Sequence, residues 1–186
     1  SIDQFFYEDN GKKYMFWGSF RGIYATELTD NGLEIKKKTD GTPVLKKRIC
    51  GNRFEGTNIY KRGEYYYLFA SIGTCCNGAT STYQTVVGRS KNVLGPYLDK
   101  TGRDMLYDYC EIIMSGNETW AGPGHNSILI QDDVGTDWII YHGYKKKEAE
   151  NGRYVLMDKL IWSNDGWPSV KSNAPSILEV APYFQK

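Results

Sequence analysis

Short runs of alternating apolar and polar residues, separated by glycine-containing turns, dominate this chain. No segment carries apolar residues at the 3.6-residue spacing of a long, capped helix. Asn-Gly and Asp-Gly turn sequences lie at residues 9–11, 30–32, 40–41 and 164–166. Alternation interrupted by such turns predicts β-hairpins, so we expect an all-β fold. Further strands are expected at 23–28, 83–89 and 153–162.

Three segments repeat one pattern, in which a β-rich run, a polar turn with a glycine and a second apolar run follow one another. They span residues 2–19 around Gly11, 54–71 around Gly63 and 124–143 around Gly135. These turn glycines are 52 and then 72 residues apart, and the second gap holds an insertion near 104–122. A recurring unit of about 40–50 residues with four strands is typical of a β-propeller blade. An immunoglobulin-like sandwich is the alternative, but it does not explain the recurrence.

The repeat places a chemically useful side chain at one equivalent position. Asp3 and Glu55 each lie eight residues before their turn glycine, and His125 lies ten before because its turn is longer. We expect all three to start equivalent inner strands of a propeller and to face one cavity. Two carboxylates in one cavity suit acid–base catalysis, since like charge and partial burial keep one of them protonated.

The composition is that of an ordinary globular domain with an excess of tyrosine. The chain has 186 residues, enough for one domain, and 15 of them are tyrosines. The net charge of +1 offers no electrostatic case for binding nucleic acid or an anionic membrane. No apolar run approaches the ~18 residues that a membrane helix needs. Lysine-rich runs at 36–38, 46–48 and 145–147 are interpreted as solvated turns or strand edges.

The four cysteines form no metal-binding pattern. Cys50, Cys75, Cys76 and Cys110 include no C-x-x-C pair, and no histidine lies at ligand spacing. A bridge between the adjacent Cys75 and Cys76 would be strained, so we expect buried free thiols. A thiol-dependent or metal-dependent enzyme is therefore disfavoured.

Several stretches together carry a family resemblance. They are SID at 1–3, FWGSFRGI at 16–23, FEGTNIYKRGEYYYLFAS at 54–71, CCNG at 75–78, STY at 81–83, VGRS at 87–90, GPY at 95–97, GPGHN at 122–126 and DGWP at 165–168. In combination they resemble glycoside hydrolase family 43, near its endo-arabinanases and the arabinosidase–xylosidase group. The resemblance spans nearly the whole chain, although no single stretch would suffice.

The resemblance implies a five-bladed β-propeller, of which this chain holds about three blades. The whole chain, 1–186, would be the C-terminal part of one catalytic domain, with blades at about 1–50, 51–110 and 120–186. Because the chain begins directly on the first repeat, we expect the N-terminal blades to lie upstream or on a second chain.

The resemblance also implies an activity, namely hydrolysis of arabinose- or xylose-containing plant polysaccharides (arabinan, arabinoxylan or xylan) with inversion. It implies Glu55 as the general acid and Asp3 as a second carboxylate that tunes and orients this acid. It implies His125 as a ligand, largely through water, of a calcium ion. A single histidine among waters and oxygens suits a hard cation better than zinc.

Two departures from the family pattern matter. Family members often have a proline two residues after the acid, where this chain has Thr57. The family's general base is an aspartate on the first blade, and no residue here can be assigned to it. Such a base holds water on the far face of the sugar, ~6.5–9.5 Å from the acid. This chain alone is therefore expected to hydrolyse little or nothing.

Other residues are candidates for contact with the sugar. Ser19, Phe20 and Arg21 follow a strand end and are expected to line the sugar site. Trp120 is expected to form a sugar platform or to pack in the core or at its rim. His142, in the middle of a strand, is interpreted as a packing residue.

A rival hypothesis comes from another class of protein, a non-catalytic carbohydrate-binding propeller fragment. It would bind sugar without turnover. In either case the expected partner is a plant cell-wall polysaccharide or oligosaccharide, with no nucleic acid and no membrane. Because such polymers are met outside the cytoplasm, we expect a secreted or periplasmic protein.

Overall fold

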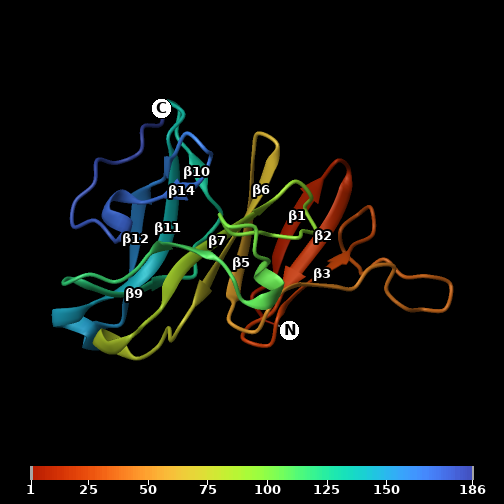
Figure 1. The fold of residues 1–186 in the computed structure, drawn as a ribbon, viewed down its shortest axis with the longest axis horizontal. Helices are drawn as coiled ribbons and strands as arrows, with labels where there is room; N and C mark the ends of the chain where they lie inside the picture. Colours follow the sequence, from red (N-terminus) through yellow and green to blue (C-terminus); the bar gives the residue numbers. More distant parts are fainter. Residues whose placement is uncertain (1, 186) are drawn as a thin grey trace. The chain divides into compact units, whose positions relative to one another are not determined.

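The structure is a computed structural model that describes residues 2–185. Within this range it contains fourteen strands, four short 3₁₀ helices and no α-helix, which confirms the all-β prediction (Figure 1). None of these helices is long or apolar enough to cross a membrane. The described residues divide into two compact units, treated separately below: residues 2–69 with 87–111, and residues 70–86 with 112–185.

The first unit contains a four-stranded antiparallel sheet. Its strands lie in chain order and are β1 (Phe5–Asp9), β2 (Lys12–Trp17), β3 (Ile23–Glu27) and β4 (Lys47–Cys50). Asn10 and Gly11 join β1 to β2 with φ of 50° and 76°, the left-handed values that a two-residue hairpin turn requires. Strand β2 buries Tyr14 and Phe16 and leaves the residues between them partly exposed. The predicted period-two hairpin is therefore confirmed here.

The second sheet also has four strands in chain order. They are β5 (Glu55–Arg62), β6 (Tyr65–Ile72), β7 (Gln84–Ser90) and β8 (Glu111–Met114), and the boundary between the units passes within this sheet. Strand β6 is buried along almost its whole length, as expected for a strand in the interior of a sheet. The turn at Gly63, with φ of 58°, joins β5 to β6 as predicted.

In the second unit, β11 (Asp137–Lys145) is the central strand. It pairs with β12 (Arg153–Lys159) on one edge and with β9 (Trp120–Gly124) and β10 (Ile130–Gln131) on the other. The β-rich run expected at the start of the third repeat is thus wrong in part, because residues 125–129 separate β9 from β10. The ladder between β9 and β11 shifts register at His142 and Tyr144, and His125 has a φ of 48°. A further pair of strands is formed by β13 (Ile161–Trp162) and β14 (Pro168–Ser169).

Buried aspartates tie this second unit together. Each accepts a hydrogen bond from the polar end of a large aromatic side chain, which satisfies both partners in the core. The pairs are Asp132 with Trp138, Asp137 with Trp162 and Asp158 with Tyr141. The charged groups therefore stabilise the packing of the aromatic residues around them.

The cysteine prediction is wrong for one pair. Cys75 and Cys76 form a disulfide between neighbouring residues and are not buried. They lie in an irregular segment after β6, where no strand geometry forces successive side chains to opposite faces. Cys50 is a buried free thiol, as expected, and Cys110 is free and partly buried.

This arrangement predicts the reactivity of the thiols. Burial raises the pKa of the Cys50 thiol well above its ordinary value and that of Cys110 to about 11. At pH 8 only about one Cys110 in a thousand is then a thiolate, the reactive form. We expect slow alkylation of the native protein, and fast addition of two groups, at Cys75 and Cys76, after mild reduction. Peptide mass spectrometry measures the alkylation of the native and of the reduced protein. Fast labelling of Cys75 without reductant would contradict the disulfide.

Candidate active site

Glu55 is the best-positioned acidic side chain among the predicted site residues. It begins β5 and is only 8% exposed. The Ser19 hydroxyl donates a hydrogen bond of 2.7 Å to Glu55 Oε2, and the two residues also form an isolated antiparallel bridge. The Phe20 amide donates to the Phe54 carbonyl oxygen at 3.0 Å. A buried carboxyl group positioned on a strand by a hydrogen bond is what a general acid requires.

The segment that carries Ser19 folds tightly because of its glycines. Gly18 has a φ of 135°, and a Cβ atom there would lie 2.1 Å from the carbonyl oxygen of Gly22. No other residue fits this close approach of two backbone segments. The resulting turn directs the chain from β2 so that Ser19 meets Glu55.

Asp3 lies in the same unit as Glu55, before the first strand. It is partly exposed, in a bend with φ of 57°, and β1 begins only at Phe5. The Gly18 amide donates to the carbonyl oxygen of Ile2 at 3.1 Å, which places Asp3 beside the segment that carries Ser19. The prediction that Asp3 starts a strand is wrong, since its left-handed backbone cannot join the ladder. Its role as second carboxylate stays a prediction.

Phe20 and Arg21 are both exposed next to this arrangement. Phe20 is 42% exposed, and its backbone is bonded to the residue before Glu55. An exposed aromatic face beside a buried acid suits the C–H face of a sugar ring. Contact of Ser19, Phe20 and Arg21 with substrate stays a prediction.

In the second unit, His125 is an exposed residue that follows β9. The prediction that it begins a strand is therefore wrong. Its backbone amide donates to the Ser71 hydroxyl oxygen at 2.7 Å. A Cβ atom on Gly124 would lie 2.4 Å from the ring of Tyr83, so this glycine permits the close packing that leads into His125.

Sequence reasoning assigned no role to Ser71, although the repeat contained a signal for it. Ser19 lies eight residues after Gly11, and Ser71 lies eight residues after Gly63. Each hydroxyl binds the predicted functional residue of the following repeat, Glu55 for Ser19 and His125 for Ser71. Serines at equivalent positions of the repeat thus form hydrogen bonds to Glu55 and His125, which are themselves at equivalent positions.

The His142 ring contacts Tyr83, His125 and Arg153 in the second unit. Its ring stacks on Tyr83 at 5.9 Å, which agrees with the packing interpretation, and lies 6.3 Å from the ring of His125. Its Nε2 is 3.2 Å from the guanidinium of Arg153, and its Nδ1 is buried without a hydrogen-bond partner among the described residues. Burial, with the charges of Arg153 and His125, lowers the pKa of His142 to about 4. The imidazole is therefore neutral at neutral pH.

Trp120 is largely buried rather than open. It is 9% exposed, and its ring meets Tyr154 edge-on at 5.9 Å. This placement agrees with the packing alternative, and a role as sugar platform stays a prediction.

The donor atoms near His125 suit a cation held mostly by water. Residues 2–185 contain no group of three or more His, Cys, Asp or Glu that could hold a metal ion. The exposed imidazole of His125 can donate a ligand atom, as can the amide oxygen of Asn126, which is buried with no hydrogen-bond partner among residues 2–185. Calcium accepts oxygen ligands and completes its shell with water, so these residues fit it better than zinc. The prediction that Asp3, Glu55 and His125 meet in one cavity involves both units and stays a prediction.

The chain belongs to glycosyl hydrolases family 43, because the model of this family matches residues 1–168. This confirms the resemblance drawn from the motifs. A buried acid on an all-β scaffold is consistent with a glycosidase of this family.

Similar proteins act on arabinan. The chain is 36% identical, over 88% of its length, to an extracellular exo-α-(1→5)-L-arabinofuranosidase of Cellvibrio japonicus, of which it covers 49%. It is 35% identical, again over 88%, to an extracellular endo-α-(1→5)-L-arabinanase of Bacillus subtilis, of which it covers 48%. The chain therefore spans about half the length of these curated relatives.

Solved structures of arabinanases share the fold. The α-L-arabinanase of Cellvibrio cellulosa, complexed with arabinohexaose, matches with a TM-score of 0.77 at 34% identity over 92% of this chain and 57% of its own. An exo-1,5-α-L-arabinanase from a bovine ruminal metagenomic library also matches with a TM-score of 0.77, at 35% identity over 92% of this chain and 56% of its own.

Proposed function

We propose that the whole protein carrying this chain is an inverting glycoside hydrolase that cleaves arabinan, with Glu55 as its general acid. The observation that carries the proposal is the buried Glu55 carboxylate, held at the start of β5 by the Ser19 hydroxyl. The relatives support the choice of substrate, since they are named arabinanases and arabinofuranosidases and one was solved with arabinohexaose.

In the proposed reaction, Glu55 gives its proton to the departing glycosidic oxygen as the bond to the anomeric carbon breaks. A water oxygen bonds to this carbon from the opposite face, and its proton passes to a general base. Asp3 orients Glu55 and holds the sugar. The proposal assigns the base to an aspartate in the part of the relatives' fold that this chain does not span.

The proposed scaffold is a five-bladed propeller. Three of its blades would be the sheet of β1–β4, the sheet of β5–β8, and the sheet around β11 with β13 and β14. The four-stranded composition of the first two sheets supports this assignment. We also propose that the protein is secreted, supported by two relatives that are named extracellular.

The function is tested with a panel of polysaccharides. We expect the whole protein to release reducing sugar from linear α-1,5-arabinan at least about 100-fold faster than from xylan. Proton NMR should show the β-anomer first if the α-linkage is cleaved with inversion. Ligand-induced thermal stabilisation without sugar release would instead favour the non-catalytic carbohydrate-binding alternative. Release of the α-anomer first would exclude inversion.

We also propose that His125 and Asn126 hold a calcium ion, largely through water. The ion would supply a fixed positive charge beside His125. Removal of calcium by a chelator should lower the melting temperature by about 5–10 °C, compared with the protein in calcium at 100 times the Kd of the site. Calcium should restore it, and the His125→Ala variant should show neither change. An equal response of wild type and variant would contradict this site.

A further inference from the structure

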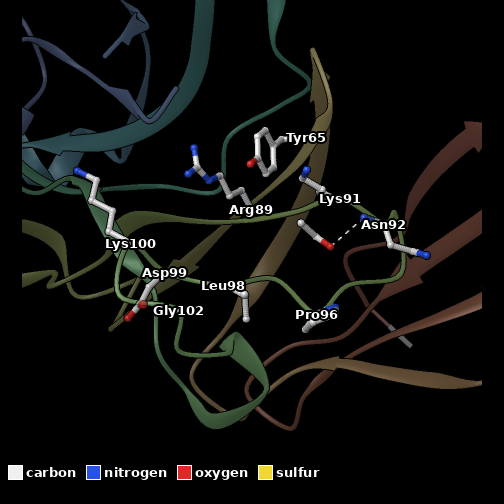
Figure 2. Close-up of a pocket in the computed structure, with 10 residues that line it drawn as sticks. Tyr65, Arg89, Lys91, Asn92, Pro96, Leu98, Asp99, Lys100 and Gly102 are labelled. Atoms are coloured by element: carbon white, nitrogen blue, oxygen red, sulfur yellow. Dashed lines mark hydrogen bonds between the residues drawn. The ribbon is translucent and has the colours of Figure 1, made fainter. Parts of the chain in front are cut away.

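One hollow in the first unit lies away from the candidate acid. It has a volume of about 510 Å³ and is lined by Tyr65 at the start of β6, by Arg89 at the end of β7 and by the segment 90–102 that follows (Figure 2). Glu55 begins β5, and the hollow lies beyond the far end of that strand, past the turn at Gly63. Eight residues of extended strand separate the two ends by roughly 23 Å. The hollow is therefore not part of the arrangement around Glu55.

Apolar surface and cations share this hollow. The ring of Tyr65 with Pro96 and Leu98 supplies the apolar surface. The guanidinium of Arg89 lies 4.5 Å from the centre of the Tyr65 ring, and Lys91 Nζ lies 5.6 Å from it. Figure 2 shows Tyr65 between these two cationic side chains, with Leu98 and Pro96 across from them. A ligand here would meet an aromatic ring and positive charge together.

Positive charge exceeds negative charge among the lining residues. Lys100 adds to Arg89 and Lys91, and Asp99 is the one carboxylate among the lining residues of this hollow. Asp99 is 3% exposed and accepts hydrogen bonds from the Arg103 Nε at 2.8 Å and from the Arg103 amide at 2.9 Å. Its charge is therefore balanced by Arg103. Lys91 also pairs with Glu64 at 3.4 Å, but both side chains are well exposed, so water screens this pair strongly.

We propose that this hollow binds a carboxylate-bearing sugar, such as a uronic acid unit of an acidic polysaccharide. A guanidinium and ammonium groups bind a carboxylate through charge-assisted hydrogen bonds. The apolar surface of Pro96 and Leu98, across from the Tyr65 ring that the two cations flank, matches the C–H face of the same sugar ring. A free phosphate would use only the charges, whereas a neutral pentose would use only the apolar surface. The site would hold the protein on an acidic polymer while the distant acid acts on a neutral one.

The experiment is calorimetric titration of the whole protein with α-1,4-linked trigalacturonate at low salt. The matched ligand is its methyl ester, which keeps the shape but removes the charge. We expect saturable binding of the acid and at least tenfold weaker binding of the ester. The Lys91→Gln/Lys100→Gln variant should bind the acid at least tenfold more weakly, whereas the control Lys37→Gln/Lys38→Gln, with the same loss of charge at exposed positions, should bind it unchanged.

Several results would overturn the proposal: no saturable binding, equal binding of acid and ester, or equal loss in the control variant. Competition by inorganic phosphate or by a triglutamate peptide as strong as that of trigalacturonate would also overturn it, because the hollow would then select charge alone. If the double variant fails to fold, the comparison of acid with ester on the wild type decides. The titration needs no hydrolysis, so its failure leaves the assignment of Glu55 untouched, and failure of Glu55 as acid leaves this site untouched.

Discussion

The Glu55→Gln variant of the whole protein will hydrolyse natural arabinan about 10²–10⁴-fold more slowly than the wild type, the usual contribution of a general acid. Glutamine keeps the shape of the side chain, and its amide oxygen still accepts the hydrogen bond that Ser19 donates at 2.7 Å. It cannot give a proton to the leaving oxygen. The loss should therefore lie in kcat, measured by reducing-sugar release, with folding unchanged.

Graded controls separate proton donation from structure. An aryl arabinofuranoside with a good leaving group needs little protonation, so the variant should lose much less activity on it. Ser19→Ala removes a hydrogen bond to a carboxylate and should cost about tenfold on arabinan. Glu34→Gln changes an exposed glutamate and should change nothing. Unaltered kcat of Glu55→Gln on arabinan would reject Glu55 as the acid.

Substitution of Gly18 by alanine will lower the free energy of unfolding by at least about 3 kcal/mol. The added Cβ would lie 2.1 Å from the Gly22 carbonyl oxygen, and the φ of 135° is unfavourable for any other residue. The turn must open to accept the methyl group, which also moves Ser19 away from Glu55. Chemical denaturation measures the stability, and kcat on arabinan reports the displaced hydroxyl.

Gly11→Ala is the matched control for this prediction. Gly11 also has a left-handed φ, 76°, but a Cβ atom there would meet nothing within 4 Å. The Gly11→Ala variant should therefore lose only the free energy of unfolding that the unfavourable backbone conformation costs, about 1–2 kcal/mol. The difference between the two variants isolates the steric clash. Equal losses would show that the turn after β2 tolerates a side chain.

Part of the site was predictable because the sequence repeat indicates where turns and strands begin. Glu55 lies at a fixed distance from a turn glycine, and the period-two pattern places it at the beginning of β5. The same spacing relates Ser19 to Ser71, so the sequence contains their equivalence in the repeat, although Ser19 donates to a side chain and Ser71 accepts from a backbone amide. Local signals were sufficient here because strands and tight turns are set by residues close in sequence.

Other parts could not be predicted. His125 lies in a break between β9 and β10, and a shift of register opposite it, on β11, accompanies that break. The disulfide of Cys75 and Cys76 depends on a backbone that leaves the sheet after β6. For His125 the deciding geometry comes from how distant strands pair, and for the cysteines from an irregular backbone; the alternation of side chains along one strand contains neither.

By itself the sequence determined the all-β class, the turns at Gly11, Gly63 and Gly135, the family, and Glu55 as the candidate acid, because these depend on local spacing and on motifs. Only the tertiary structure decided which hydroxyl holds Glu55, that Trp120 is buried, and that His142 lies beside His125 as a neutral imidazole. It also brought Tyr65 and Arg89 together with the segment of Lys91 and Lys100. These contacts join residues far apart in the chain, and packing selects them only once the sheets have formed.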